Sequence, residues 1–169
     1  MMTQSLPQTR QTPAAGGIAG LVGGAVGLLD ALPKSLALLA ARVALAVPFY
    51  YSGLTKWDGF LALSDSAVLL FTEEFKLNLF GGQYGLPFPA LMALLAGLAE
   101  VSLPILLVLG LGTRFAALGL LAMTGVIQLV YPEAWHTFHL PWAALALTLV
   151  MFGGGKLTLD HLIGRWRNG

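Results

Sequence analysis

A single carboxylate, Glu100, lies near the middle of an apolar run that extends from Ala90 to Gly110. A run of this kind matches the ~20 apolar residues that cross the ~30 Å hydrocarbon layer of a bilayer. A charged side chain at that depth costs roughly 2.5–3.5 kcal/mol, so Glu100 needs a partner within the protein. Arg42 is the other charge deep inside an apolar run, and it is the partner that the sequence predicts.

The predicted pair of Arg42 and Glu100 has two interpretations. Either it binds a quinone headgroup or passes a proton, since ionisable residues within membranes mark such sites, or it clamps two helices in register without any chemistry. Pro104 bears on the second interpretation. It has no amide hydrogen, so the carbonyl of Glu100 loses its donor within the helix. Arg42 or a water molecule would then donate the missing hydrogen bond.

Two histidines three residues apart, His136 and His139, form a second and weaker candidate site. Together with Glu133 they could bind copper or zinc. The alternative is a pair of surface histidines in a loop beside Trp135. The chain contains no cysteine, which excludes disulfide exchange, thiolate nucleophiles and cysteine-ligated iron–sulfur clusters within it.

The composition indicates an integral membrane protein, because 57% of the residues are hydrophobic and only 10% are charged, against about 25% charged in soluble domains. The net charge of +1 gives no indication of a nucleic-acid partner. We predict an all-α bundle of four transmembrane helices in a lipid bilayer, with an amphipathic surface helix between the first two spans. The predicted spans cover residues 35–55, 88–111, 115–131 and 140–155, and the surface helix covers residues 61–80.

The N-terminal part of the chain differs from the rest, and we expect residues 1–34 to be separate from a membrane domain at 35–169. Residues 1–13 are polar and are expected to be disordered. Residues 14–29 are apolar but short and rich in glycine, so they form an interfacial or loosely ordered segment, a span or a signal peptide. Gly16, Gly20 and Gly24 have a spacing that permits close helix contact in lipid, and a homo-oligomer is compatible with the sequence.

The distribution of basic residues predicts the orientation of the chain. One side of a four-span topology carries Arg10, Lys34, Arg114, Lys156, Arg165 and Arg167, whereas the other side carries two lysines among five acidic residues. Because basic residues favour the cytoplasmic side, both termini are expected in the cytoplasm.

Four motifs of this chain occur in the order and spacing of a known family. They are Arg42 followed by residues 49–56 (FYYSGLTK, with Ser52, Gly53 and Lys56), Glu100, residues 109–114 (LGLGTR, with Thr113 and Arg114), and residues 153–160 (GGGKLTLD, with Asp160). The chain resembles the DoxX family of small bacterial four-helix inner-membrane proteins. Gly154 stands where the family often has proline. The stretch from Trp57 to Lys76 resembles a subgroup found beside genes for copper-binding modified peptides.

The resemblance implies an accessory subunit of a redox or metal-stress system, with quinone bound near Arg42 and Glu100. Founding members of the family are subunits of thiosulfate:quinone or quinol oxidase systems, and others are described as partners in oxidant defence. A non-catalytic subunit is expected rather than an enzyme; a redox-active chain would be a component of a quinone-linked oxidoreductase. Two alternatives remain open: a membrane anchor or helper that exports or handles a metal-binding modified peptide, and a small transporter.

Overall fold

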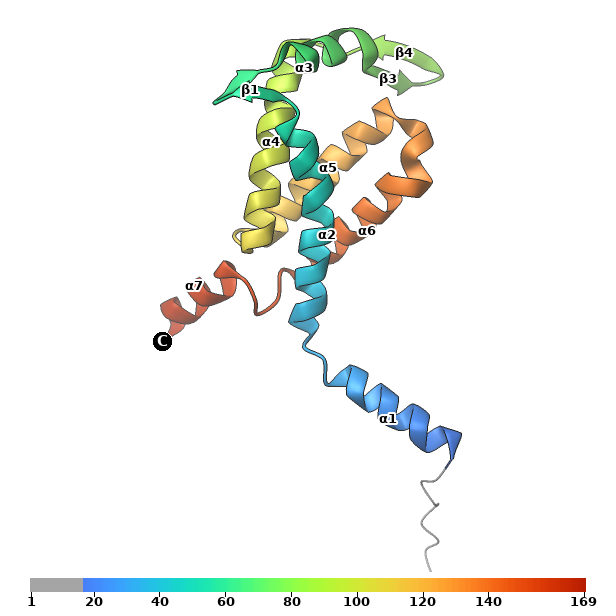
Figure 1. Ribbon diagram of the computed structural model, residues 1–169, viewed down its shortest axis with the longest axis vertical. Coiled ribbons are helices and arrows are strands. Elements are labelled where there is room, and N and C mark those ends of the chain that lie inside the picture. The colour runs from blue at the N-terminus through green and yellow to red at the C-terminus, as the bar shows by residue number, and fades with distance from the viewer. Residues whose placement is uncertain (1–16) are drawn as a thin grey trace, which may run out of the picture. The chain divides into compact units, whose positions relative to one another are not determined.

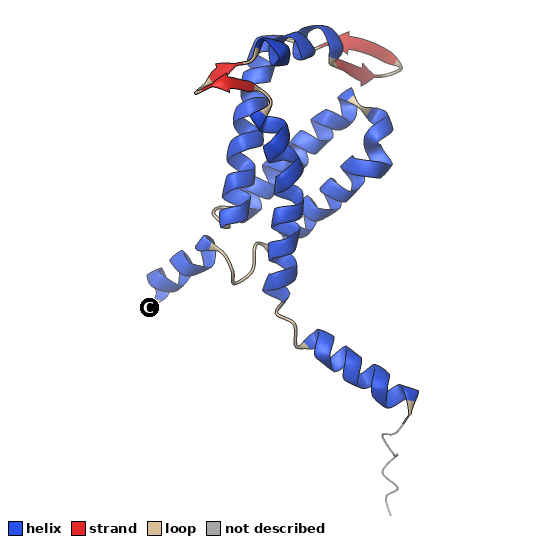
Figure 2. Ribbon diagram, in the orientation of Figure 1, coloured by secondary structure: helices blue, strands red, loops and turns tan. Residues whose placement is uncertain are grey.

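The computed structural model describes residues 17–169, which form helices and two small β-hairpins (Figures 1 and 2). The polar stretch 1–13, with its expected disorder, lies outside the described residues. The chain divides into two compact units, residues 1–33 and 34–169. In the first unit, part of the glycine-rich stretch forms helix α1 (Ile18–Asp30), in which no residue is buried. A Cβ atom on Gly24 would meet no atom within 4 Å, so the described residues do not use this glycine for close packing.

Three helices of the second unit are long and apolar enough to cross a membrane: α2 (Lys34–Leu54), α4 (Pro89–Leu109) and α5 (Thr113–Val130). Helix α6 (Leu140–Phe152) is apolar but has only 13 residues, which is about 20 Å at 1.5 Å per residue. The described residues therefore give three candidate spans together with shorter apolar helices, and the predicted count of four spans is not confirmed.

The core of this unit lies where α2, α4, α5 and α6 meet. Helix α2 packs along α4, and α5 packs along α6. Leu45, Phe49, Leu107, Leu120 and Leu149 are at most 2% exposed and fill the centre of the bundle. Elsewhere, most large apolar side chains of the long helices remain exposed, as expected for surfaces that contact lipid rather than water.

The connection between α2 and α4 does not form the predicted amphipathic helix over 61–80. We call residues 57–85 the cap. The cap contains a hairpin of β1 (Trp57–Gly59) and β2 (Ala62–Leu63), the short helix α3 (Asp65–Leu69), a π-helix (Leu70–Glu74), and a hairpin of β3 (Lys76–Leu79) and β4 (Gly82–Gly85). Figure 2 shows both hairpins at the same end of the long helices.

Turn chemistry explains why the helical prediction was wrong. Leu79 pairs with Gly82, so the second hairpin closes through a loop of Phe80 and Gly81. Both loop residues have positive φ, 51° and 82°, as a tight type I′ hairpin turn requires. The Asn78 amide then donates hydrogen bonds to the carbonyls of Leu129 (3.0 Å) and Val130 (3.1 Å). It thereby ties the cap to the end of α5.

The C-terminal segment forms helix α7 (Leu159–Asn168), which is amphipathic. Its apolar residues Leu162, Ile163 and Trp166 are exposed. Thr158 begins the helix, because its hydroxyl accepts a hydrogen bond from the amide of His161.

Candidate functional site

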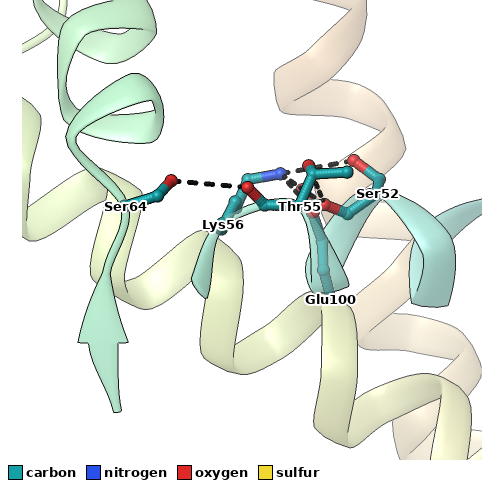
Figure 3. Close-up of polar contacts among 5 residues, drawn as sticks. All are labelled: Ser52, Thr55, Lys56, Ser64 and Glu100. Atoms are coloured by element: carbon teal, nitrogen blue, oxygen red, sulfur yellow. Dashed lines mark hydrogen bonds and ion pairs between the residues drawn. The ribbon is translucent and has the colours of Figure 1, made fainter. Parts of the chain in front are cut away.

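The partner of Glu100 is Lys56 rather than the predicted Arg42. The Lys56 Nζ atom lies 2.5 Å from Glu100 Oε2, and the two residues are only 8% and 5% exposed. The ammonium group also donates to the hydroxyl of Ser52 (3.2 Å) and to the carbonyl of Ser52 (3.3 Å). Figure 3 shows the three side chains converging between α2 and α4. The buried charge of Glu100 is therefore neutralised within the bundle.

The register between α2 and α4 decides this pairing. Gly53 lies against Glu100, since a Cβ on Gly53 would be 2.9 Å from the backbone carbon of Glu100. Arg42 is eleven residues earlier in α2, about 16 Å along the helix axis at 1.5 Å per residue. Lys56 follows Gly53 by three residues, and its flexible side chain extends back toward Glu100.

Two small residues let the chain after α2 approach α4. A Cβ on Gly97 would lie 2.8 Å from the Trp57 ring and 3.4 Å from the Cβ of Lys56. Ala93, one turn away, is fully buried. The small residues on the face of α4 that carries Glu100 therefore permit the close approach of Lys56 and Trp57.

An apolar cavity of about 420 Å³ borders the ion pair. The volume lies within the range of about 300–1,000 Å³ that is typical of small-molecule sites. Most of the lining comes from α4, α5 and the cap, and Ser52, Lys56 and Glu100 supply its polar end. The other lining residues are Phe71, Phe75, Leu86, Met92, Leu95, Ala96, Ala99, Ala122, Met123, Val126, Ile127, Val130 and Tyr131.

The cap closes the cavity with aromatic rings. Phe71 is only 8% exposed and packs on Phe75, with ring centroids 4.8 Å apart. Phe75 in turn meets Tyr131 edge to face at 5.6 Å. Burial, with the nearby Glu74 and Glu133, raises the pKa of the Tyr131 phenol. The phenol therefore stays neutral at physiological pH, and the rings form an uncharged wall.

The polar end of the cavity offers one donor and one acceptor. Ser52 Oγ accepts a hydrogen bond from Lys56, which leaves the hydroxyl proton of Ser52 free to donate. Glu100 Oε2 is held by Lys56. Among the described residues Glu100 Oε1 has no hydrogen-bonding partner, and it is not among the fully enclosed polar atoms. A ligand with either a carbonyl or a hydroxyl group would find a matching partner here.

Arg42 has a different role, at the far end of α4. It is fully buried and donates to three carbonyls, those of Leu107 (3.3 Å), Val108 (2.9 Å) and Leu157 (2.5 Å). The last carbonyls of a helix have no partner within the helix, and a cation stabilises that end. Arg42 therefore caps the C-terminus of α4, and it does not contact the carbonyl freed by Pro104.

Asp160 complements Arg42 by capping the next helix. Its carboxylate accepts hydrogen bonds from the amides of Gly112 (2.7 Å) and Thr113 (2.9 Å) and from the Thr113 hydroxyl (3.0 Å). Partial burial acts to raise the pKa of Asp160, but these hydrogen bonds and the charge of Arg42 outweigh it and lower the pKa overall. The two helix ends of the α4–α5 turn are thus held by opposite charges.

Glycines in this turn make room for that arrangement. Gly110 has φ of 70°, and a Cβ on it would lie 2.6 Å from Thr158 and 2.7 Å from Arg42 Nη1. A Cβ on Gly154 would clash with the Thr158 side chain and would lie 2.8 Å from the Thr113 hydroxyl, so this glycine is part of the same packing.

The sequence profile of the DoxX family matches residues 37–132, more than half of the chain. The chain belongs to the DoxX family. A relative from Haemophilus influenzae (strain ATCC 51907 / DSM 11121 / KW20 / Rd), named only as an uncharacterized protein, is 29% identical over 153 residues. The match covers 80% of this chain and 88% of the relative. No solved structure matches the chain. Family membership and the apolar helices together identify a membrane protein.

The residues that carried the DoxX resemblance fall into two separate groups in the structure. Ser52 and Lys56 join Glu100 at the cavity, and Gly53 packs against Glu100. Arg42, Thr113 and Asp160 lie at the α4–α5 turn. Arg114 is next to this second group, with its Nε atom 3.4 Å from the Cβ position of Gly153. The sequence places Lys56 in a family motif at the end of a span but gives no indication that it pairs with Glu100, because that contact depends on how α2 packs against α4.

The two histidines of the predicted metal site lie in different environments. Among the described residues no group of three His, Cys, Asp or Glu side chains is placed to hold a metal ion. His139 is 2% exposed, its Nδ1 atom lies 2.6 Å from Gln128 Oε1, and its ring packs on Trp142. His136 is exposed instead. Gln128 thus links α5 to the segment before α6, whereas Thr124 bonds to the Leu120 carbonyl of its own helix.

Proposed function

We propose that the protein is an accessory subunit of a membrane redox or metal-stress system and that its cavity binds a quinone. The observation that carries the proposal is the apolar cavity of about 420 Å³ that ends at Ser52, Lys56 and Glu100. A quinone combines an apolar ring and tail with two polar oxygens, which is the chemistry that this lining matches.

The polar end suits both redox forms of such a ligand. The Ser52 hydroxyl can donate to a ligand carbonyl, and Glu100 Oε1 can accept a hydrogen bond from a ligand hydroxyl. Lys56 holds both groups in place through its bonds to Ser52 and to Glu100 Oε2. A bound quinone would supply two-electron, two-proton redox chemistry, with a partner protein as the electron source. The residues of this chain would bind the quinone and fix its orientation.

Four spans and cytoplasmic termini are part of the proposal. The π-helix Trp135–His139 runs directly into α6 and lengthens it to 18 residues. At the opposite end of the bundle, the Lys156 amide bonds to Ser35 Oγ (2.9 Å), which brings the end of α6 to the start of α2. Lys34, Arg114 and Lys156 thus belong to one end, which the positive-inside rule assigns to the cytoplasm of a bacterial inner membrane. A C-terminal tag accessible from outside intact cells would contradict this topology.

Quinone content of the purified protein tests the proposal. Protein extracted gently from its own membrane should carry quinone, measured by solvent extraction and mass spectrometry. Ser52→Ala and Glu100→Gln should each lower the quinone content per protein, because the first removes the donor and the second replaces the charged acceptor with a weaker neutral one. Thr148→Val, at an exposed position of α6 outside the cavity lining, is the matched control and should retain wild-type content. Wild-type protein without quinone, even after the addition of quinone to the membrane, would refute the proposal.

A second candidate function rests on the cap. The tips of its two hairpins expose Phe60 (96%) and Phe80 (105%), and each two-stranded sheet has free edges on which an extended peptide could add a strand. These features support a helper that handles a modified peptide. Phe60→Ser with Phe80→Ser should then abolish cross-linking of the peptide while leaving quinone content unchanged.

A further inference from the structure

The cavity beside Lys56 and Glu100 opens sideways, between two helices of membrane-spanning length. Its walls come from one face of α4 and one face of α5. Leu95 on α4 and Val126 on α5 line it, yet they are 50% and 54% exposed on the surface of the protein. Both residues lie inside the long helices rather than in the cap, so the opening faces the lipid rather than water.

Packing between the two helices explains the opening. Near their shared turn, α4 and α5 are in close contact, since a Cβ on Gly119 would lie 2.8 Å from Leu103. Toward the cap the walls carry the small side chains of Ala96, Ala99 and Ala122, and the space between the helices becomes the cavity. The aromatic residues of the cap cover it from the end of the bundle.

We infer that the cavity takes an amphiphilic ligand from the bilayer through a lateral portal between α4 and α5, with the ligand's polar head at Ser52 and Glu100 and its alkyl tail in the portal. This inference rests on the proposed quinone site and adds the route of entry and the need for a tail. The lining supports this orientation because its polar groups lie at one end and the portal residues are apolar. A tail that leaves through the portal stays in contact with apolar side chains and lipid.

The inference is tested with two probes that share one benzoquinone ring, one without a tail and one with a ten-carbon tail. Their affinities are measured in lipid nanodiscs for the wild type and for Ala122→Phe, which places a ring in the portal. We expect the tailed quinone to bind the variant at least about tenfold more weakly, the loss that corresponds to about two methylene groups losing their burial. The tail-less quinone should bind both proteins equally.

Two further variants distinguish an obstructed portal from a general disturbance of the fold. Leu95→Trp obstructs the portal from the opposite wall and should reproduce the selective loss. Leu118→Phe adds bulk at another exposed position of α5, outside the cavity, and should leave both affinities unchanged. Agreement between the two portal variants would locate the effect at the opening.

The outcomes separate the portal from the proposed function. If both quinones bind the wild type and neither is affected by Ala122→Phe or Leu95→Trp, the portal is wrong and the quinone site stands. If both quinones lose affinity equally, the substituted positions belong to the headgroup site and the portal is again refuted. If neither quinone binds the wild type, the proposed function fails, and the portal inference fails with it.

Discussion

Removal of either charge of the buried Lys56–Glu100 pair should destabilise the protein severely. Lys56→Met leaves the carboxylate of Glu100 in an apolar environment, and Glu100→Met leaves the ammonium of Lys56 there. At an effective dielectric constant of about 20, opposite charges 2.5 Å apart attract by roughly 6–7 kcal/mol. Desolvation of the two groups offsets part of this attraction. We therefore expect each single substitution to lower the free energy of unfolding by about 3–5 kcal/mol.

A double-mutant cycle isolates the interaction between the two charges. The double variant Lys56→Met with Glu100→Met leaves no unpaired charge in the bundle. Its loss in free energy of unfolding should therefore be much smaller than the sum of the losses in the two single variants. We expect a coupling free energy above about 2 kcal/mol, within the range found for residues in direct contact. The measurement is equilibrium unfolding in mixed micelles, followed by tryptophan fluorescence.

The pair predicted from the sequence supplies the comparison cycle. Arg42 and Glu100 are about 16 Å apart along the bundle, so Arg42→Gln and Glu100→Met should be additive within about 0.5 kcal/mol. Lys76→Met, which removes a lysine whose contact with Thr72 is exposed, should change stability by no more than about 0.5 kcal/mol. Strong coupling of Glu100 to Arg42, with none to Lys56, would refute the helix register on which the site is built.

Three further predictions concern packing and pH. Gly53→Ala should destabilise the protein by about 1–3 kcal/mol in the same unfolding assay, because its Cβ would lie 2.9 Å from Glu100; an unchanged stability would mean that α2 and α4 are not in such close contact. Because the pKa of Asp160 is lowered from 3.8 in the folded state, its contribution is complete above that value and is lost as the pH falls further. Asp160→Asn should remove this acid dependence from the unfolding curve. His139→Ala should lower the free energy of unfolding by about 1–3 kcal/mol in the same assay, because it leaves Gln128 Oε1 without the His139 ring and removes the packing on Trp142; an unchanged stability would mean that the buried histidine does not hold α5 to the following segment.

Much of the fold follows from the sequence because it depends on local patterns. The three long apolar runs give the helices α2, α4 and α5, and the run from Gly110 to Arg114 gives the turn between the last two. The short amphipathic C-terminal helix also follows from its own residues. The cap was predicted incorrectly because its apolar spacing fits a surface helix. The signal for hairpins was present in glycines at the turns, with Gly59 just before the first turn and Gly81 within the second, but the helical pattern outweighed it.

The partner of Glu100 could not be predicted from local sequence patterns. The sequence by itself determined that Glu100 needs a partner, since an unpaired carboxylate within an apolar span is too costly. Only the tertiary structure decided that the partner is Lys56. The choice depends on the register of α2 against α4, which is set by Gly53 and Gly97 and by the fold of the connecting cap. It also depends on a flexible lysine side chain that extends back along its helix, whereas Arg42 is held by the carbonyls that end α4.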